Sequence, residues 1–411
     1  MNSYFATVEQ QANPRLRGKP VGVTGGDRME RTVLGAASVE AKHWGVKTGM
    51  LGWQAKKLCP QIIIIPGDSE KYLECTKRFL NILKDYSPYL EVFSIDECFL
   101  EVSKNPIKIA KLIKQRIRSE IGEWITCSIG ISYNKLLAKL AGSLQKPDGL
   151  VVIPDQEEAI KILNGVELDD ICGIGPRIKY HLHKMGIFNF RQLRQVPLEI
   201  LLMSFKSYGQ FLYDAARGID HSLVLPFYEK EEVKSVGHRH TIDHDTKDPN
   251  QIRQILFKLC EMVASRLRAK NLVGKTIHCW YRRGGANVIH LIHPPGGIAW
   301  HPSFFGDGMQ ATIPYTCDGL EIFQSAWKIF QSMWTGQKIR MVGAAVSNLK
   351  SQTPHNLTFL ESDYKKELIN KILDKINGKF GEFTLQRGIL LHSTSMRRKP
   401  NPYLADRRFK L

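Results

Sequence analysis

Hydrophobic and polar positions alternate with two periods along the chain, and the change of period separates its parts. In the first 150 residues, segments with apolar residues at helical spacing alternate with short strand-like runs. The predicted helices are 72–83, 107–121 and 135–144, and the predicted strands are 91–95, 98–102 and 125–131, besides an opening strand at residues 1–9. The order of these elements fits a ferredoxin-like βαββαβ unit.

The second half of the chain is predicted to form further parts. Residues 155–225 have a helical pattern with short loops, and from Lys234 the period changes to two. A separate α+β unit follows, with a predicted helix at 251–267 and predicted strands at 275–282 and 338–349. The stretch 284–307 is rich in Gly, Pro and His, which indicates a long loop or hairpin.

The last segment, residues 351–411, is predicted to be an appendix to this unit. Leu368, Ile372 and Ile376 belong to one apolar helical stripe, and Gly378 is placed to cap that helix. The residues from Met396 onward are strongly basic, and we expect them to be mobile.

The length and composition of the chain limit the classes of molecule with which it can interact. The 411 residues suffice for roughly two to four domains. A formal net charge of +18 favours a polyanionic partner, nucleic acid first and an anionic membrane second. No run of about 18 apolar residues is present, so no membrane span is predicted. The eight cysteines include no C-x-x-C pair, which disfavours a zinc site or a disulfide framework and indicates a reduced, cytoplasmic protein.

The adjacent carboxylates Asp96 and Glu97 are the strongest candidate for chemistry. Neighbouring side chains on a regular strand point to opposite faces, so both can serve one site only where the chain bends. Predicted strands on both sides place the pair at a hairpin turn, which meets this condition. Two carboxylates in one bend suit Mg²⁺, which takes hard oxygen ligands. The alternative is a solvated turn, since acidic residues are common in turns.

Two stretches of the chain resemble the catalytic motifs of the Y-family DNA polymerases of the DinB type. They are Met1–Glu9 and Ser94–Leu100. The resemblance implies that Asp96 and Glu97 bind two Mg²⁺ ions and that Tyr4 and Phe5 edge the nucleotide site. Phe5 matches the steric gate, whose flat ring collides with a 2′-hydroxyl. From the residues alone, core packing is the alternative for both aromatics.

The opening motif departs from the family pattern in one respect. In the family an aspartate stands directly before the residue that matches Met1, and it supplies the first metal ligand. We therefore expect the chain to be truncated at its N-terminus, within a central strand. Glu9 cannot replace this ligand if the strand is extended, since it would lie about 30 Å away.

The segment 38–50 resembles the family's fingers motif and predicts a triphosphate pocket. In the family a tyrosine and an arginine there hold the β- and γ-phosphates, whereas this chain has Val39 and Lys42. Valine offers no donor, and lysine keeps the charge without the bidentate fork of arginine. A solvated helix face is the alternative for Lys42. Lys146, in a Lys-Pro-Asp-Gly turn, matches the third phosphate ligand without departure.

Residues 168–186 resemble a helix-hairpin-helix thumb. Backbone N–H groups of its glycine-rich turn can approach a phosphate at a helix start without any side-chain charge. The resemblance implies DNA contacts from Gly173, Gly175, Arg177 and Lys179. The alternative is a tight turn between two helices.

Two basic stretches, 234–241 and 340–349, resemble the first and last strands of the family's little finger. Small residues between basic ones let a strand's backbone lie close to a row of phosphates, which positions a duplex without reading its sequence. The contacts implied there come from Lys234, Ser235, Arg239 and Arg340. Solvated side chains are the alternative at each position.

The resemblance spans nearly the whole chain and implies an α+β right-hand polymerase. Its parts are a ferredoxin-like palm (1–9 and 67–154), small fingers (10–66), a helix-hairpin-helix thumb (155–228), an α+β little finger (234–350) and the appendix (351–411). The implied reaction is the template-directed, error-prone addition of deoxynucleotides to a primer 3′-hydroxyl, of the lesion-bypass type, by a monomer.

The implied partners are primer-template DNA and deoxynucleoside triphosphates. A sliding clamp is a further candidate, because residues 356–360 lie where the family often carries a clamp-binding peptide; a short buried strand is the alternative. Two rival functions stay open. The absent aspartate and the departures at Val39 and Lys42 favour a non-catalytic DNA-binding protein on the same scaffold. A helix-hairpin-helix nuclease would leave Phe5 and Lys146 unexplained.

Overall fold

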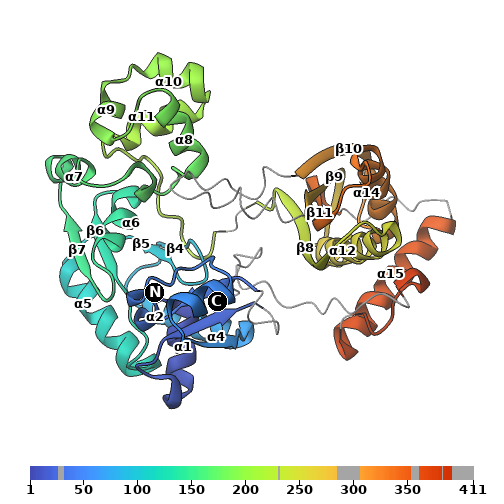
Figure 1. Ribbon diagram of the computed structural model, residues 1–411, viewed down its shortest axis with the longest axis horizontal. Helices are drawn as coiled ribbons and strands as arrows, with labels where there is room; N and C mark the ends of the chain where they lie inside the picture. The colour runs from blue at the N-terminus through green and yellow to red at the C-terminus, as the bar shows by residue number, and fades with distance from the viewer. Residues whose placement is uncertain (26–31, 230–231, 285–305, 353–360, 382, 391–411) are drawn as a thin grey trace. The chain divides into compact units, whose positions relative to one another are not determined.

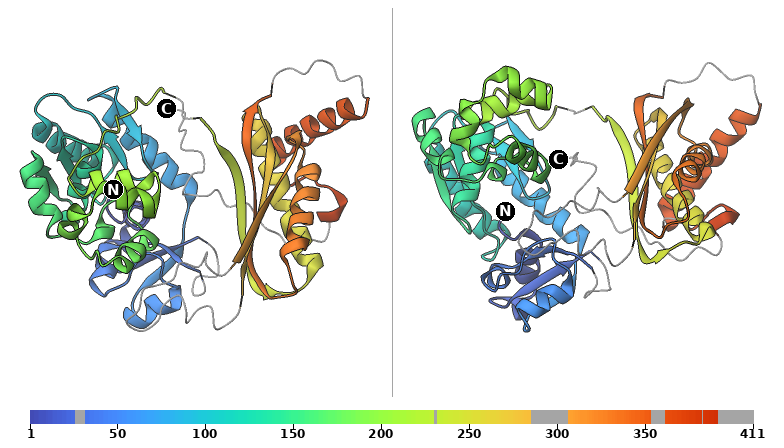
Figure 2. Two further views of the ribbon diagram at one scale, coloured as in Figure 1. Left: turned by 90° about the horizontal axis from the view of Figure 1, so that it is seen from above. Right: turned by 45° about the horizontal axis from the view of Figure 1, so that its top comes forward.

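The structure is a computed structural model, shown in Figures 1 and 2. It describes residues 1–25, 32–229, 232–284, 306–352, 361–381 and 383–390. Contacts within the chain divide it into two compact units, residues 1–230 and residues 231–398. Both units have hydrophobic cores of their own, so each can hold its side chains in place independently.

The chain enters the first unit through a buried helix, which makes the strand predicted for residues 1–9 wrong. Ser3 turns the chain at a φ of 45°, and helix α1 (Tyr4–Ala12) follows directly. Phe5 and Val8 are 6% and 5% exposed and lie in one core. Every side chain from the first to the seventh residue of α1 is buried, so no polar face reveals the helical period in the sequence.

A three-stranded sheet forms the region predicted as the fingers. Its strand order is β2–β1–β3, with β2 antiparallel and β3 parallel to β1. The elements are η1 (Pro14–Leu16), β1 (Val21–Thr24), β2 (Leu34–Ala37), α2 (Val39–His43), α3 (Gly52–Leu58) and β3 (Ile63–Pro66). The Ser38 hydroxyl accepts a bond from the Ala41 N–H and fixes the start of α2, the helix that carries Lys42.

Two short sheets and three longer helices form the region predicted as the palm. The elements are α4 (Ser69–Lys84), β4 (Leu90–Val92), β5 (Cys98–Leu100), α5 (Pro106–Arg116), its extension η2 (Ile117–Ile121), β6 (Ile129–Ser132), α6 (Lys135–Leu144) and β7 (Leu150–Ile153). β4 pairs antiparallel with β5, and β6 pairs parallel with β7. The predicted helices 72–83 and 135–144 are confirmed, whereas the strand predicted for 125–131 forms only from Ile129 onward.

Short helices complete the first unit. They are α7 (Gln156–Leu163), η3 (Leu168–Asp170), α8 (Pro176–Lys184), α9 (Phe190–Gln195), α10 (Leu198–Phe205) and α11 (Tyr208–Ala215). Leu137 and Leu140 of α6 share a core with Leu182 of α8 and Phe190 of α9. Helix α6 therefore connects the palm region to the helical region that follows it.

The second unit is a four-stranded antiparallel sheet covered by helices. The strand order is β10–β9–β11–β8. The elements are β8 (Ser235–Thr246), α12 (Pro249–Ala269), β9 (Leu272–Arg283), β10 (Gly306–Thr316), α14 (Gly319–Met333) and β11 (Ile339–Ser351). Figure 2 shows α12 and α14 on one face of the sheet, and their apolar side chains form its core. The predicted helix and strands are confirmed, and β10 was not foreseen.

The appendix begins with a helix that is fastened to the second unit. Helix α15 (Glu361–Phe380) is followed by the short η5 (Gly388–Leu390), whose Leu390 is 1% exposed within the core of that unit. The helix runs through Gly378, so the predicted cap is wrong. It ends instead before Gly381, which has a φ of 107° and donates its N–H to the Asn377 carbonyl.

Candidate active site

The turn between β4 and β5 carries the two candidate carboxylates. The backbone N–H groups of Phe93 and Ser94 both donate to the carbonyl oxygen of Glu97, over 3.0 and 2.9 Å, which closes the turn. The Ser94 hydroxyl donates to Asp96 Oδ1 over 2.8 Å and orients that carboxylate. The bend predicted from the sequence is therefore present, and neighbouring carboxylates can serve one site across it.

The first residues of the chain lie beside this turn. The amino group of Met1 donates to the Asp96 carbonyl over 2.7 Å, and the Asn2 N–H donates to the Thr126 carbonyl over 2.9 Å. Met1 and Asn2 thus run between the carboxylate hairpin and the segment that leads into β6. A positive amino group close to the carboxylates also makes this end of the hairpin more favourable for negative charge.

The Glu97 carboxylate is surrounded by cations. Burial alone would raise the pKa of Glu97, but the hydrogen bond from Lys139, over 2.7 Å, together with the charges of Lys139, the Met1 amino group and Lys146, holds it below its usual value. Glu97 is therefore ionised throughout the neutral range. Lys139 was not foreseen from the sequence, although its spacing of four residues from Lys135 on the predicted helix 135–144 was a usable signal.

Lys42 and Lys146, the two predicted phosphate ligands, lie close enough to influence each other. Burial lowers the pKa of Lys42, and the charge of Lys146 lowers it further. The two cations come from different elements, α2 and the turn after α6, and the charge of Lys146 also acts on the Glu97 carboxylate. Such a pair suits an anionic ligand such as a triphosphate, whose charge would relieve their mutual repulsion.

Tyr4 and Phe5 both lie in the core of the first unit. The Tyr4 hydroxyl is hydrogen-bonded to the Tyr72 carbonyl and to Thr76 Oγ1, each over 2.8 Å, and burial raises its pKa well above the usual range. This argues against a direct contact of Tyr4 with a nucleotide. The Phe5 ring stacks on the Tyr72 ring with centroids 4.4 Å apart. A ring supported in this way has the rigidity that a steric gate requires.

Glu9 has a structural role. Its carboxylate accepts hydrogen bonds from Lys71 Nζ over 2.7 Å and from the Tyr72 hydroxyl over 2.8 Å. The residue is 6% exposed. These two partners occupy the Glu9 carboxylate, which argues against a role as substitute metal ligand. The distance expected for an extended strand does not apply, because Glu9 lies in helix α1.

The glycine-rich turn before α8 has the shape of a phosphate-binding element. Gly173 has a φ of 107°, and a Cβ there would lie 2.7 Å from the Phe211 ring, so no other residue fits without rearrangement. Gly175 precedes α8 with no side-chain cap, and a Cβ there would meet open space. Lys179 differs from the expectation: its ammonium pairs with Glu167 and Asp169 over 3.0 and 2.6 Å, which argues against a phosphate contact.

The predicted DNA contacts of the second unit lie on its sheet. Lys234, Ser235 and Arg239 are exposed on or directly before β8. Arg340 of β11 pairs with Asp245 over 2.7 Å. This carboxylate partly neutralises the positive charge of Arg340 and so weakens its attraction for a phosphate. Burial and the nearby Arg340 and Arg239 lower the pKa of Arg282 on β9. Arg282 was missed because its position within a predicted strand gave no sign of its neighbours across the sheet.

The residues at the carboxylate turn fit a divalent metal with few protein ligands. Asp96 and Glu97 offer hard oxygens, and Mg²⁺ is usually held by one or two carboxylates together with substrate phosphates and water. Within the described parts of the chain, no group of three or more His, Cys, Asp or Glu side chains forms a complete metal cage.

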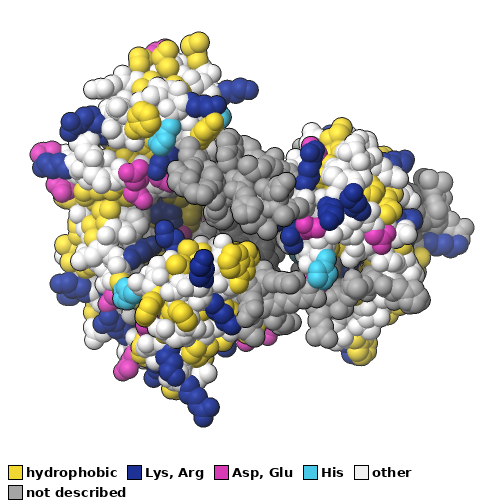
Figure 3. Space-filling model, viewed as in Figure 1, with side chains coloured by type: hydrophobic (Ala, Val, Ile, Leu, Met, Phe, Trp, Pro, Cys, Tyr) yellow, Lys and Arg dark blue, Asp and Glu magenta, His cyan; other side chains and the backbone are white. Residues whose placement is uncertain are grey.

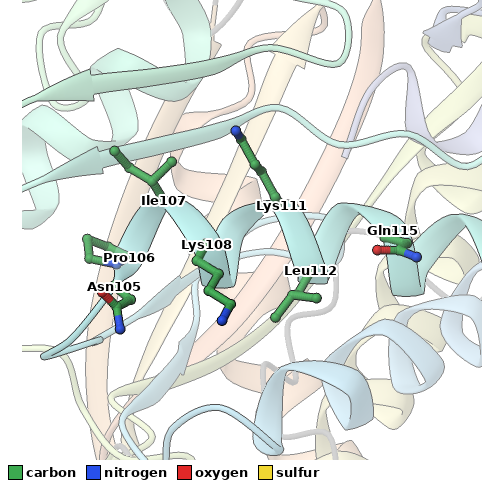
Figure 4. A pocket seen from close by; sticks show the side chains of 7 residues that line it. All are labelled: Asn105, Pro106, Ile107, Lys108, Lys111, Leu112 and Gln115. Carbon is green, nitrogen blue, oxygen red and sulfur yellow. The ribbon is translucent and has the colours of Figure 1, made fainter.

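A surface pocket of about 620 Å³ lies elsewhere, along α5. Figure 4 shows its lining, which comes from Asn105 to Gln115 and includes Lys108 and Lys111 but neither candidate carboxylate.

The surface of the protein carries many positive charges. Figure 3 shows Lys and Arg side chains scattered over both units. Among the described helices, none has the length and apolar character needed to cross a membrane. The candidate residues 356–360 fall outside the described part of the chain.

Three regions of the chain match known families. Residues 1–143 match the impB/mucB/samB family, residues 169–220 match the thumb domain of DNA polymerase-iota, and residues 233–359 match the C-terminal domain of the impB/mucB/samB family. The match to a thumb domain covers the glycine-rich turn and α8.

Comparison with individual relatives and with a solved structure also points to DNA polymerases. The chain is 34% identical over 399 residues to DNA polymerase IV of Moorella thermoacetica, which covers 95% of this chain and 94% of that protein. It is 38% identical over 284 residues to DNA polymerase IV of Bacteroides fragilis, covering 67% and 76%. A solved Y-family DNA polymerase chimera has a similar fold, with a TM-score of 0.71 and 24% identity, covering 85% of this chain and 97% of the other.

The chain belongs to the Y family of DNA polymerases, among relatives named DNA polymerase IV. The family predicted from the motifs and the α+β right-hand fold are thereby confirmed. The individual site residues and the boundaries of palm, fingers, thumb and little finger stay predictions.

Proposed function

We propose that the chain is a template-directed DNA polymerase of the error-prone, lesion-bypass type. The observation that carries this proposal is the closed turn between β4 and β5, where Asp96 and Glu97 lie near the ammonium groups of Lys139 and Lys146. A carboxylate pair next to cations is the arrangement that phosphoryl transfer needs, since both the metals and the triphosphate must be bound there.

Asp96 and Glu97 are the residues that would hold Mg²⁺, two ions per site. Bound there, the metal ions would neutralise phosphate charge and lower the pKa of the primer hydroxyl. The Ser94 hydroxyl keeps the Asp96 carboxylate in one orientation, and Lys139 does the same for Glu97. Lys42 and Lys146 bind the outer phosphates, with Val39 contributing no donor.

The thumb and little finger hold primer-template DNA through its phosphates. Backbone N–H groups at the start of α8, with Arg177, supply one contact region, and Lys234, Ser235 and Arg239 supply the other. These groups recognise phosphate rather than bases, so binding is independent of sequence. We further propose that the protein acts as a monomer in the cytoplasm and that residues 356–360 bind a sliding clamp.

The rival proposal is a DNA-binding protein that has lost catalysis. It is favoured by Val39 and by the absence, in the described residues, of a cluster of three or more His, Cys, Asp or Glu side chains that could hold a metal. Both proposals predict DNA binding, so only the chemistry separates them.

Primer extension by Asp96→Ala tests the proposed function. Parent and variant are compared in proteins that carry an added aspartate directly before Met1, so that the metal site is as complete as possible. We expect extension to fall by about 100-fold or more, with DNA affinity unchanged within about twofold. An Asp85→Ala variant, which removes a carboxylate from the surface pair with Arg116, is the matched control. Activity of Asp96→Ala within tenfold of the parent would refute the assignment.

A further inference from the structure

Two lysines one turn apart on α6 hold the carboxylate hairpin at two points. Lys135 Nζ lies 3.0 and 2.7 Å from the two carboxylate oxygens of Glu91 on β4, and Lys139 Nζ lies 2.7 Å from Glu97 Oε2 in the turn. The lysine side chains are only 16% and 24% exposed. Two anchors fix the orientation of the hairpin on the helix as well as its distance.

Aromatic rings of the hairpin lie under both ammonium groups. Phe93 and Phe99 meet edge to face with centroids 5.4 Å apart. Lys139 Nζ lies 4.5 Å from the Phe93 ring centre, and Lys135 Nζ lies 5.4 Å from that of Phe99. Each ammonium is attracted to the electron-rich face of its ring, which restricts its movement. Lys139 is therefore held against Glu97 by the same hairpin that it supports.

The Lys135 anchor also secures the end of the first unit. Lys135 Nζ donates to the Leu223 carbonyl over 3.0 Å, and Glu91 Oε2 accepts the Leu225 N–H over 3.1 Å. Lys135 thus has a packing role shared between several segments. Within the described parts of the chain, Lys139 makes no such backbone bond, and its ammonium donates to Glu97. Both lysines pair with a carboxylate of the hairpin, but Lys135 also binds the backbone at Leu223, whereas Lys139 binds the candidate metal ligand Glu97.

We propose that Lys139 is a positioning residue for the metal-binding carboxylates. It binds Glu97 through Oε2 and leaves Oε1 without a donor from the described residues, open to a divalent cation. This inference rests on the function proposed above. Lys139 acts through Glu97 and does not itself touch the substrate. A nearby positive charge by itself weakens cation binding, so positioning and simple repulsion predict opposite results when the lysine is removed.

The test compares Lys139→Met, Lys139→Arg and Lys139→Gln with the parent protein. Methionine keeps the length and removes the donor, whereas arginine and glutamine keep a donor. Lys161→Met is the matched control, because Lys161 also pairs with a carboxylate, that of Glu157 in its own helix, but lies on the surface of α7. Mn²⁺ binding is measured by electron paramagnetic resonance without DNA or nucleotide, alongside kcat, the KM for nucleotide and the thermal midpoint.

We expect Lys139→Met to bind Mn²⁺ several-fold more weakly and to lose about tenfold or more in kcat. The KM for nucleotide should stay within about twofold, because the phosphate ligands are untouched. Arginine and glutamine should restore most of the Mn²⁺ binding, and Lys161→Met should match the parent. If Lys139→Met does not fold, the comparison of Lys139→Gln with Lys139→Arg still separates the donor from the charge.

Equal or tighter Mn²⁺ binding by Lys139→Met would overturn the proposal and leave Lys139 as a repelling charge. Poor Mn²⁺ binding by glutamine together with good binding by arginine would overturn it as well, since the charge and not the hydrogen bond would then matter. Failure of the parent to extend a primer even with an aspartate added before Met1 would instead refute the proposed function, whatever Mn²⁺ binding the Lys139 variants show. The two failures are therefore distinguishable.

Discussion

The amino group of Met1 donates a 2.7 Å hydrogen bond to the carbonyl oxygen of Asp96. The Asn2 N–H donates to the Thr126 carbonyl over 2.9 Å, so the first two residues bridge the carboxylate turn and the segment that leads into β6. A residue joined to the nitrogen of Met1 would lie directly beside the carboxylate turn.

We expect an aspartate added before Met1, at the end of a short apolar extension, to increase primer extension by about tenfold or more. A third carboxylate completes a site for two cations, and Mg²⁺ tolerates incomplete coordination badly. The same extension ending in asparagine is the control, because it adds the same residues without the carboxylate charge. The protein that starts at Met1 should bind primer-template DNA and extend it poorly. Equal rates for the aspartate and asparagine forms would show that no third carboxylate is needed.

Phe5→Ala should raise the incorporation of ribonucleotides relative to deoxynucleotides. The ring is held by stacking on Tyr72, and its loss would leave room for a 2′-hydroxyl. Val8→Ala, which also opens space in the buried face of α1, is the control for general loosening. Single-turnover kinetics give the ratio. If it is unchanged in Phe5→Ala, or rises equally in Val8→Ala, Phe5 is a core residue and not a gate.

DNA binding should be independent of sequence and steeply dependent on salt. For roughly six to ten phosphate contacts, affinity should fall by about 10³–10⁵ between 50 and 200 mM salt. Arg239→Ala should reduce the slope of log affinity against log salt by about one. Lys179→Ala should change it less, because its ammonium is already paired with Glu167 and Asp169. Fluorescence anisotropy across a salt series measures the DNA affinity of the parent and of both variants. An affinity of the parent that does not change with salt would contradict phosphate binding.

The parts of the fold that follow local rules could be predicted from the sequence. The Asp96-Glu97 turn was found because strand-like runs border it on both sides, and α6 was found as a helical segment that stops at the Lys-Pro-Asp-Gly turn. The opening helix was missed because α1 is buried on nearly all sides. A periodic pattern identifies a helix only where one face meets water.

The candidate site was predictable as a set of residues and not as a network. Asp96, Lys42 and Lys146 stand in motifs that can be read along the chain. Lys139 and Arg282 act through neighbours distant in sequence, and only the folded chain shows those neighbours. For the same reason, the motif could not predict that Lys179 pairs with the carboxylates of Glu167 and Asp169.

A buried carboxylate, Asp318, connects the appendix to the second unit. Its Oδ1 accepts the N–H groups of Leu320 and Glu321 at the start of α14, and its Oδ2 accepts bonds from Asn370 of α15 and from Arg387. Burial alone would raise the pKa of Asp318, but the hydrogen bonds from Asn370 and the backbone, together with Arg387, hold it below its usual value. The ionised form is therefore stabilised by folding.

Asp318→Ala should destabilise the second unit by roughly 2–4 kcal/mol, since it removes a helix cap and leaves Asn370 a buried donor without its partner. Asp248→Ala is the matched control: it removes an exposed cap from α12 and should cost about 1 kcal/mol.

The same residue predicts a dependence on pH. Because folding lowers the pKa of Asp318, its contribution to the free energy of unfolding is fully present above the unfolded-state pKa of about 3.9, and it is lost as the pH falls through the folded-state pKa. The parent should therefore lose stability in acid more steeply than Asp318→Ala. Hydrogen exchange at α14 and α15 over a pH series measures both effects. Equal costs for the two variants, or parallel acid profiles for parent and Asp318→Ala, would mean that Asp318 is an ordinary cap and not the link that fastens α15.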